Sequence, residues 1–255
     1  MSIPKTIEAK LFLQHIISFF AFALLYLCYW IFLFIFRRYH IISIKDIRKQ
    51  FKSITKNTSS PLLICSNHLT YIDSVVLVLA FGSCLDYILN FRTMPWNFPK
   101  TTHMKKNIFY MLISYIGKCV FVELDDQNRS INQPMNIAKY LLNKGEYVML
   151  FPEGHRGNCG KVDTQNFTYG AGKLIKEVPN IKVLCVYVRG STQIEGSNFP
   201  NKYDKFYCKL KIIEPSNLKP QTIANNFSEL KLIRDISKNI IQILFEMEQE
   251  YFIRQ

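Results

Sequence analysis

Residues 62–81 read LLICSNHLTYIDSVVLVLAF, and this stretch decides the fold class of the chain. It begins with an apolar run at 62–65 that has the length of a buried strand. It ends with a longer apolar run at 74–81, which stops at Gly82 as helices commonly do. A buried strand, a polar turn and an apolar helix in succession form the repeating unit of α/β folds. The stretch therefore predicts an α/β protein.

The same alternation continues through residues 57–255, where no linker suggests a second domain. Apolar runs of strand length recur between helical patterns, and Gly or Pro stands near the end of most of those patterns. The predicted fold is one α/β domain with a mostly parallel central sheet flanked by helices. We expect strands at 62–65, 87–91, 119–122, 147–151, 183–188 and 206–213, and helices at 74–81, 104–116, 137–143, 171–178 and 227–251.

The composition excludes several classes of protein. Of the 255 residues, 49% are hydrophobic, which is enough to build a core and excludes intrinsic disorder. The seven cysteines contain no C-x-x-C pair, which argues against a disulfide scaffold or a zinc finger. The net charge of +13 suits a nucleic acid or an anionic membrane as partner. Because no helix-turn-helix or RNA-binding signature is present, we expect membrane lipids and no nucleic acid.

The N-terminal part of the chain is strongly apolar. Residues 11–36 contain no charged side chain, and residues 16–36 would form a helix of about 31 Å, the thickness of a bilayer's hydrocarbon core. We therefore predict a membrane-embedded helix within residues 1–36, either spanning or re-entrant. A cleaved signal peptide and a buried core helix are the alternatives. The run is long for a signal peptide, and no small-x-small cleavage site follows it.

A basic segment follows directly. Residues 37–56 carry seven basic side chains against Asp46 alone, a net charge of +6. By the positive-inside rule, this basic juxtamembrane segment stays in the cytoplasm, together with the domain at 57–255. The segment can also lie on anionic lipid headgroups, at about 1 kcal/mol per basic residue. A solvated linker is the alternative interpretation, and the two are compatible.

The first chemical signal is the turn Ser66-Asn67-His68-Leu69-Thr70-Tyr71-Ile72-Asp73. A carboxylate bound to one nitrogen of His68 would fix the tautomer and make the other nitrogen a better base. Asp73 can reach His68 only if the histidine lies in the turn and the aspartate in the first turn of the helix, because a five-residue offset does not share a helix face. Thr70 and Asp73 also match a capping box, in which the carboxylate only satisfies backbone donors.

The second signal is Phe151-Pro152-Glu153-Gly154-His155-Arg156, at the end of the strand predicted for 147–151. Pro152 ends the strand, and Gly154 permits a tight turn. Glu153 and Arg156 therefore lie at the carboxyl edge of the sheet, where α/β folds bind ligands, and Arg156 can hold a phosphate with two hydrogen bonds. A plain turn with a surface ion pair is the alternative.

Together, N-H-x-x-x-x-D and F-P-E-G-x-R behind a basic membrane anchor resemble the glycerolipid acyltransferase family, whose best-known members are the 1-acylglycerol-3-phosphate acyltransferases. The resemblance covers roughly residues 57–215. It implies acyl transfer from acyl-CoA or acyl-carrier protein, as co-substrate, to a lysolipid hydroxyl, with no metal and no other cofactor. It also implies these roles: His68 as general base, Asp73 as the residue that orients it, and Asn67, Glu153, Gly154 and Arg156 as substrate-binding residues.

The sequence departs from the family pattern at its second motif. Gly117 begins that motif, but Leu124 stands where the family usually has Arg. Arg129 or Lys118 could replace that Arg, or the acceptor could lack a phosphate. His155 also stands where Thr or Ser is common.

We therefore expect a membrane-bound acyltransferase whose leading acceptor is a lysophospholipid, most simply lysophosphatidate, in phospholipid biosynthesis. An acyltransferase for another lipid, such as a lipid A precursor or an ornithine lipid, is the nearest alternative. A catalytically silent lipid-binding relative and a membrane-bound hydrolase are the others. The chain has no G-x-S-x-G elbow, which argues against a serine hydrolase.

Overall fold

A computed structural model describes residues 3–56, 60–100, 107–122, 132–157, 160–194, 199–218 and 228–253. Within these ranges the chain forms a six-stranded sheet in the order β1-β6-β5-β2-β4-β3. The strands β3, β4, β2 and β5 run parallel, whereas β6 pairs antiparallel with β5 and parallel with β1. The prediction of a single α/β domain with a mostly parallel central sheet is therefore confirmed. The strands are β1 (His40–Ile41), β2 (Leu62–Ser66), β3 (Trp96–Asn97), β4 (Val148–Leu150), β5 (Lys182–Gly190) and β6 (Lys205–Ile213).

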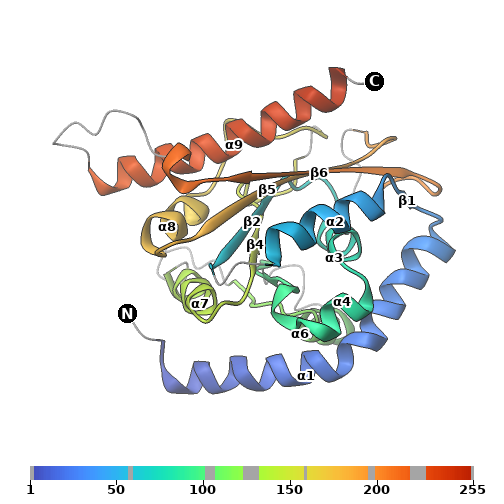
Figure 1. The fold of residues 1–255 in the computed structure, drawn as a ribbon, viewed down its shortest axis with the longest axis horizontal. Coiled ribbons are helices and arrows are strands. Elements are labelled where there is room, and N and C mark those ends of the chain that lie inside the picture. The colour runs from blue at the N-terminus through green and yellow to red at the C-terminus, as the bar shows by residue number, and fades with distance from the viewer. Residues whose placement is uncertain are drawn as a thin grey trace.

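Helices cover both faces of this sheet (Figure 1). The helices α7, α8 and α9 gather on one face, and α2 and α3 lie on the other. The helices are α1 (Lys5–Trp30), which continues as the π-helix η1 (Ile31–Phe36), α2 (Ile44–Thr55), α3 (Asp73–Phe81), α4 (Cys84–Leu89), α6 (Ile108–Ile116), α7 (Asn132–Asn143), α8 (Gly170–Glu177) and α9 (Glu229–Ile253), with short 3-10 turns η2 (Phe91–Thr93) and η3 (Pro215–Leu218).

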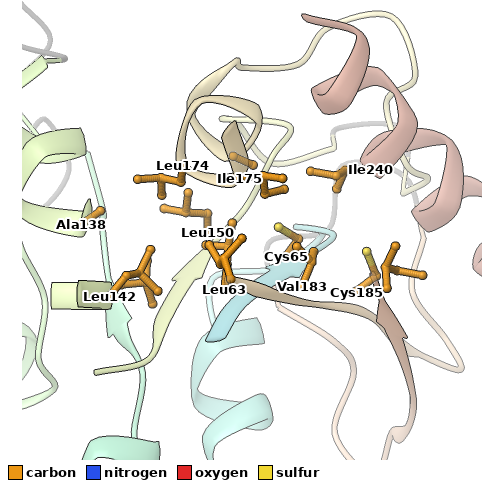
Figure 2. Close-up of a cluster of buried hydrophobic side chains, with 14 of the residues drawn as sticks. Leu63, Cys65, Ala138, Leu142, Leu150, Leu174, Ile175, Val183, Cys185 and Ile240 are labelled. Carbon is orange, nitrogen blue, oxygen red and sulfur yellow. The ribbon is translucent and has the colours of Figure 1, made fainter. Parts of the chain in front are cut away.

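The strand β2 shows how the two cores are built. Its side chains alternate between the faces of the sheet, as in any strand. Leu63 and Cys65 pack with α7, α8 and α9 in the cluster that Figure 2 shows. Leu62 and Ile64 pack on the other side, with α2 and α3. Because all five residues of β2 are buried, the apolar run that opens the motif is explained by burial on both faces.

Three elements differ from the predictions. The stretch predicted as a strand at 87–91 is instead the end of α4 and the turn η2. Ser83 and Asp86 form a reciprocal capping box at the start of α4, and this cap outweighs the strand-like composition of the segment. The strand predicted at 119–122 is reduced to single bridges from Cys119 and Val122. The strand β3 was not predicted.

The basic segment at 37–56 also contains structure that the sequence analysis did not predict. The strand β1 adds to β6 at the edge of the sheet, and α2 packs on α3 and β6. Ile47 and Phe51, one helical turn apart, are the buried side chains of α2. The folded unit therefore begins before residue 57, where the domain was predicted to start.

The apolar N-terminal helix is present as α1 and η1, and runs along one side of the molecule beside α4 and α6 (Figure 1). Among the described residues, Lys5–Phe36 is the helix that is long and apolar enough to cross a membrane. About a fifth of its most apolar window is buried against the rest of the chain. The alternative of a fully buried core helix does not describe it.

Candidate active site

The candidate site lies where β2 ends and α3 begins. Asp73 is almost fully buried, and its carboxylate collects the donors of the turn. Oδ2 accepts hydrogen bonds from the backbone N–H groups of Leu69 (2.7 Å) and Thr70 (2.8 Å), and Oδ1 accepts one from the Thr70 hydroxyl (2.5 Å). The same Oδ2 lies 3.0 Å from Nδ1 of His68. Asp73 therefore both satisfies backbone donors of the turn and contacts the histidine. The predicted capping box of Thr70 and Asp73 is not formed, because α3 begins at Asp73 and its N-cap is Ile72, whose side chain makes no cap hydrogen bond.

The contact with Asp73 orients the His68 ring. An ionised carboxylate only accepts hydrogen bonds, so the tautomer that pairs with it has its proton on Nδ1 and its lone pair on Nε2. The ring stacks on Phe151, with centroids 4.2 Å apart and planes at 24°, and the side chain is 23% exposed. Among the described residues, nothing hydrogen-bonds to Nε2. The contact holds the ring with Nδ1 toward the carboxylate and Nε2 directed away from it, and the prediction that His68 acts as a general base stays a prediction.

Glu153 joins this turn to the loop after β4. Its side chain is 1% exposed. Oε1 accepts from the backbone N–H of His68 (2.8 Å), and Oε2 accepts from that of Asp163 (3.1 Å). Burial raises the pKa of Glu153 to about 8, although these two hydrogen bonds act in the opposite direction. Both oxygens are thus used inside the protein, and the prediction that Glu153 binds substrate stays a prediction.

The turn around Gly154 needs glycine for two reasons. Its φ is +70°, in the left-handed region. A Cβ atom there would lie 2.2 Å from Cγ2 of Thr168. Three residues later, the backbone N–H of Gly157 donates to the carbonyl of His68 (2.8 Å), which is a second link between the two motifs. The predicted substrate contact of Gly154 is not tested by this geometry.

Arg156 lies over the ring of Tyr71, which belongs to the same turn as His68. Its Cζ is 3.5 Å from the ring centroid, and Tyr71 is 45% exposed. The structure therefore brings the F-P-E-G-x-R arginine to the histidine turn. Stacking fixes the plane of the guanidinium and orients the N–H groups at its edge. The sequence analysis did not single out Tyr71.

Asn67 extends the pairing of β2 with β5. It is fully buried, its Nδ2 donates to the carbonyl of Val188 (2.9 Å), and its Oδ1 accepts from the Val188 N–H (2.8 Å). These two hydrogen bonds fix the backbone at Asn67, directly before His68. The structure thus gives Asn67 a positioning contact, and its predicted contact with substrate stays a prediction.

His155 is held by its own loop. Its Nδ1 lies 2.8 Å from the carbonyl of Glu153 and its Nε2 lies 3.1 Å from Oδ2 of Asp163. Desolvation would raise the pKa of Asp163, but hydrogen bonds from Asn166, Gln165 and His155 lower it to about 2. Because both ring nitrogens of His155 have partners, His68 is the better candidate for a base.

Lys118, one candidate for the missing second-motif arginine, lies elsewhere. It is completely buried, and its Nζ is 2.6 Å from Oε2 of Glu146 and 2.9 Å from the carbonyl of Met94. Burial lowers its pKa to about 8, partly offset by Glu146. Lys118 therefore forms an ion pair with Glu146 inside the protein. The other candidate, Arg129, lies outside the described residues, as does Leu124.

Within the described ranges, no group of three or more His, Cys, Asp or Glu side chains is arranged to hold a metal ion. The residues that the structure brings together are those of one acid–base pair with an arginine nearby. This arrangement can remove a proton from a hydroxyl and can attract an anionic group.

Comparisons with known proteins agree with the motifs. The family model described as Acyltransferase matches residues 45–189, more than half of the chain. A probable 1-acyl-sn-glycerol-3-phosphate acyltransferase of Mycoplasma genitalium (strain ATCC 33530 / DSM 19775 / NCTC 10195 / G37) is 28% identical over 208 residues, which are 80% of this chain and 69% of the relative. The chain therefore belongs to the glycerolipid acyltransferase family, and it is an enzyme that transfers acyl groups in lipid metabolism.

Proposed function

We propose that the enzyme transfers a fatty acyl chain from acyl-CoA or acyl-carrier protein to the hydroxyl of a lysophospholipid, most simply lysophosphatidate, at the cytoplasmic face of a membrane. The observation that carries the proposal is the 3.0 Å contact between Nδ1 of His68 and Oδ2 of Asp73. The relative from Mycoplasma genitalium, named for the same acceptor, supports the choice of lysophosphatidate.

The proposed reaction uses the tautomer of His68 that has its proton on Nδ1. Nε2 takes the proton of the acceptor hydroxyl while the hydroxyl oxygen bonds to the carbonyl carbon of the thioester. The carbon–sulfur bond then breaks, and the departing thiolate takes the proton from the imidazolium. Asp73 stabilises the imidazolium that forms in between, as a buried carboxylate does beside a catalytic histidine. No covalent acyl-enzyme is needed, so no nucleophile is assigned.

Arg156 is the residue that we assign to the phosphate of the acceptor. Its stacking on Tyr71 places a fixed cation beside the turn that carries His68. Arginine binds phosphate with paired hydrogen bonds, and a rigid guanidinium loses less conformational entropy on binding. An acceptor without phosphate, such as an ornithine lipid, is the second candidate, because Leu124 stands where the family usually has arginine.

The test is an assay of the full-length protein in lipid-containing detergent micelles. Labelled acyl-CoA and acyl-carrier protein are offered with lysophosphatidate, other lysophospholipids, a lipid A precursor and a lyso-ornithine lipid. We expect transfer to lysophosphatidate in the parent protein and none in His68→Ala, with His155→Ala close to the parent. Transfer only to a phosphate-free acceptor would overturn the acceptor assignment. Lipid binding without any transfer would identify a silent relative.

A further inference from the structure

The C-terminal helix α9 holds a carboxyl group in the core of the protein. Apart from Ser237 and Glu248, the buried side chains of α9 are apolar or aromatic, and they pack the helix on β5 and α8. Glu248 is completely buried. A buried carboxyl destabilises the folded state unless its hydrogen bonds offset the loss of water, and an apolar side chain carries no such cost. The packing of α9 alone therefore does not explain a glutamate at this position.

Glu248 binds the loop at 160–163, which follows the F-P-E-G-x-R motif. Its Oε1 accepts hydrogen bonds from the backbone N–H of Val162 (3.1 Å) and from the hydroxyl of Tyr187 in β5 (3.2 Å). Burial raises the pKa of Glu248, although these two hydrogen bonds act in the opposite direction. Val162 is itself buried, and a buried N–H without an acceptor is costly. The carboxyl of Glu248 is the acceptor that allows Val162 to lie in the core.

The next amide of the same loop binds a second buried carboxyl. The N–H of Asp163 donates to Oε2 of Glu153 (3.1 Å). Two consecutive amides thus donate to carboxyls from different parts of the fold, one on α9 and the other in the turn after β4. The position of the loop is set by both carboxyls at once.

Glu153 connects this loop to the histidine turn. Its other oxygen, Oε1, accepts from the backbone N–H of His68 (2.8 Å). Three hydrogen bonds therefore join α9 to His68, with only the Val162–Asp163 peptide unit and the side chain of Glu153 between them. Because protein interiors are close-packed, a shift of the loop would displace Glu153 and, with it, the backbone of His68.

Arg189, near the end of β5, attaches the same loop to α9 at another point. Its Nη1 donates to the carbonyl of Gly160. Its Cζ lies 5.0 Å from the ring centroid of Phe252 and 5.9 Å from that of Tyr251, both close to the end of α9. The loop is therefore fixed at Gly160 as well as at Val162, in each case by contacts that involve α9.

We infer that Glu248 is a positioning residue for acyl transfer: by binding the Val162 N–H, it keeps Asp163 where it supports Glu153 and the backbone of His68. Glu248 touches no reacting atom in this role and acts through Glu153. The inference rests on the proposed function, in which His68 is the base. It gives α9 a part in the reaction, although α9 carries neither of the two motifs.

The first test compares two conservative variants of Glu248 in the full-length protein, assayed in lipid-containing detergent micelles. Glu248→Gln keeps an oxygen of the same reach for the Val162 N–H. Oε2 has no hydrogen-bond partner among the described residues, so the amide nitrogen can take its place without loss of a contact. We expect kcat close to that of the parent protein. Glu248→Asp keeps the carboxyl but is one methylene shorter, so kcat should fall about 10- to 100-fold, with the KM values for acyl-CoA and lysophosphatidate little changed.

Glu246→Asp, on the exposed side of α9, is the matched control and should keep the kcat of the parent protein. The Tm of each variant shows that the assayed protein is folded. A lower Tm for Glu248→Asp with an unchanged kcat would identify a structural role alone and overturn the inference. Equal losses of kcat in Glu248→Asp and Glu248→Gln would also overturn it, because the accepting oxygen would then not be what matters.

The second test measures hydrogen exchange at single amides and does not need activity. In Glu248→Asp, the N–H groups of Val162, Asp163 and His68 should exchange faster than in the parent protein, whereas Glu248→Gln and Glu246→Asp should leave them unchanged. Faster exchange at Val162 with no change at His68 would show that the connection ends in the loop, and the inference would be wrong. If the parent protein transfers no acyl group but all three amides respond, the proposed reaction falls and the connection from Glu248 to His68 stands.

Discussion

Nδ1 of His68 and Oδ2 of Asp73 lie 3.0 Å apart, although the two residues are five positions apart in the sequence. The distance is short because the residues between them form a turn that folds back over the start of α3. The carboxylate oxygen that meets the ring is the same one that accepts the N–H groups of Leu69 and Thr70. The orientation of the histidine and the shape of the turn therefore both depend in part on this oxygen atom.

Asp73→Asn tests that dependence. An asparagine amide that donates to Nδ1 would favour the tautomer with the proton on Nε2, which cannot act as a base. We expect kcat to fall by about 10² to 10⁴. Asp86→Asn is the matched control, because Asp86 caps α4; it should cost about 1 kcal/mol of stability and leave kcat unchanged. Equal kcat values for Asp73→Asn and the parent protein would rule out the assigned role.

The raised pKa of Glu153 predicts how stability changes with pH. In the folded protein the pKa is about 8, against 4.5 for the unconstrained side chain. Between these values the folded state holds a proton that the unfolded state has lost, so the free energy of unfolding falls as pH rises from about 5 to 8, by at most about 1.4 kcal/mol per pH unit from this group. Urea unfolding in detergent at several pH values measures the slope.

The variant Glu153→Gln cannot titrate and should show a flatter slope than the parent protein. Glu246→Gln, on the exposed side of α9, is the control and should keep the slope of the parent. If Glu153→Gln and the parent protein lose stability equally between pH 5 and pH 8, the carboxyl is ionised throughout and the explanation fails.

The pair of Lys118 and Glu146 predicts a coupled effect on stability. Lys118→Met leaves the Glu146 carboxylate without its cation and should lower the free energy of unfolding by about 3 kcal/mol. Adding Glu146→Gln should recover part of that loss, since the second substitution removes the unpaired charge. The KM for the acceptor should not change in either variant. If Lys118→Met raises the KM without loss of stability, the internal ion pair is not the role of Lys118, and Lys118 is instead a substrate-binding residue.

Arg156 and Tyr71 predict a selective effect on binding. Removing the guanidinium in Arg156→Ala should raise the KM for lysophosphatidate about 10- to 100-fold, the loss expected for charged hydrogen bonds. Tyr71→Ala should raise KM less, and Tyr71→Phe should restore it, because the ring remains for Arg156 to stack on. An equal rise in KM for an acceptor without phosphate would contradict the assigned contact.

The sequence predicted those parts of the fold where apolar spacing decides the structure. The run at 62–65 became β2, and the run at 74–81 became α3. The strand predicted at 87–91 is wrong. Its aromatic residues favour strands, but the capping box of Ser83 and Asp86 starts the helix α4 just before them. It also missed α2, whose charged residues outnumber the two apolar positions that bury the helix.

The sequence predicted which residues lie at the site better than it predicted where their side chains point. The spacing of His68 and Asp73 allowed a contact, and the structure contains it. The inward direction of Glu153 could not be predicted, since it follows from the backbone of the turn at Gly154. Lys118 has a φ of +55°, and the sequence held no sign that its side chain would enter the core.

The stacking of His68 on Phe151 has a consequence for which sequence changes the enzyme tolerates. Phe151 follows β4, and β4 is aligned with β2 so that Leu150 lies opposite Cys65. Inserting or deleting one residue in either strand would turn the following side chains to the other face and separate the two rings. Conservative apolar replacements in β4 should therefore be accepted far more readily than any change in its length. The placement of the His68 ring therefore depends on strand alignment, which is shared by segments more than eighty residues apart.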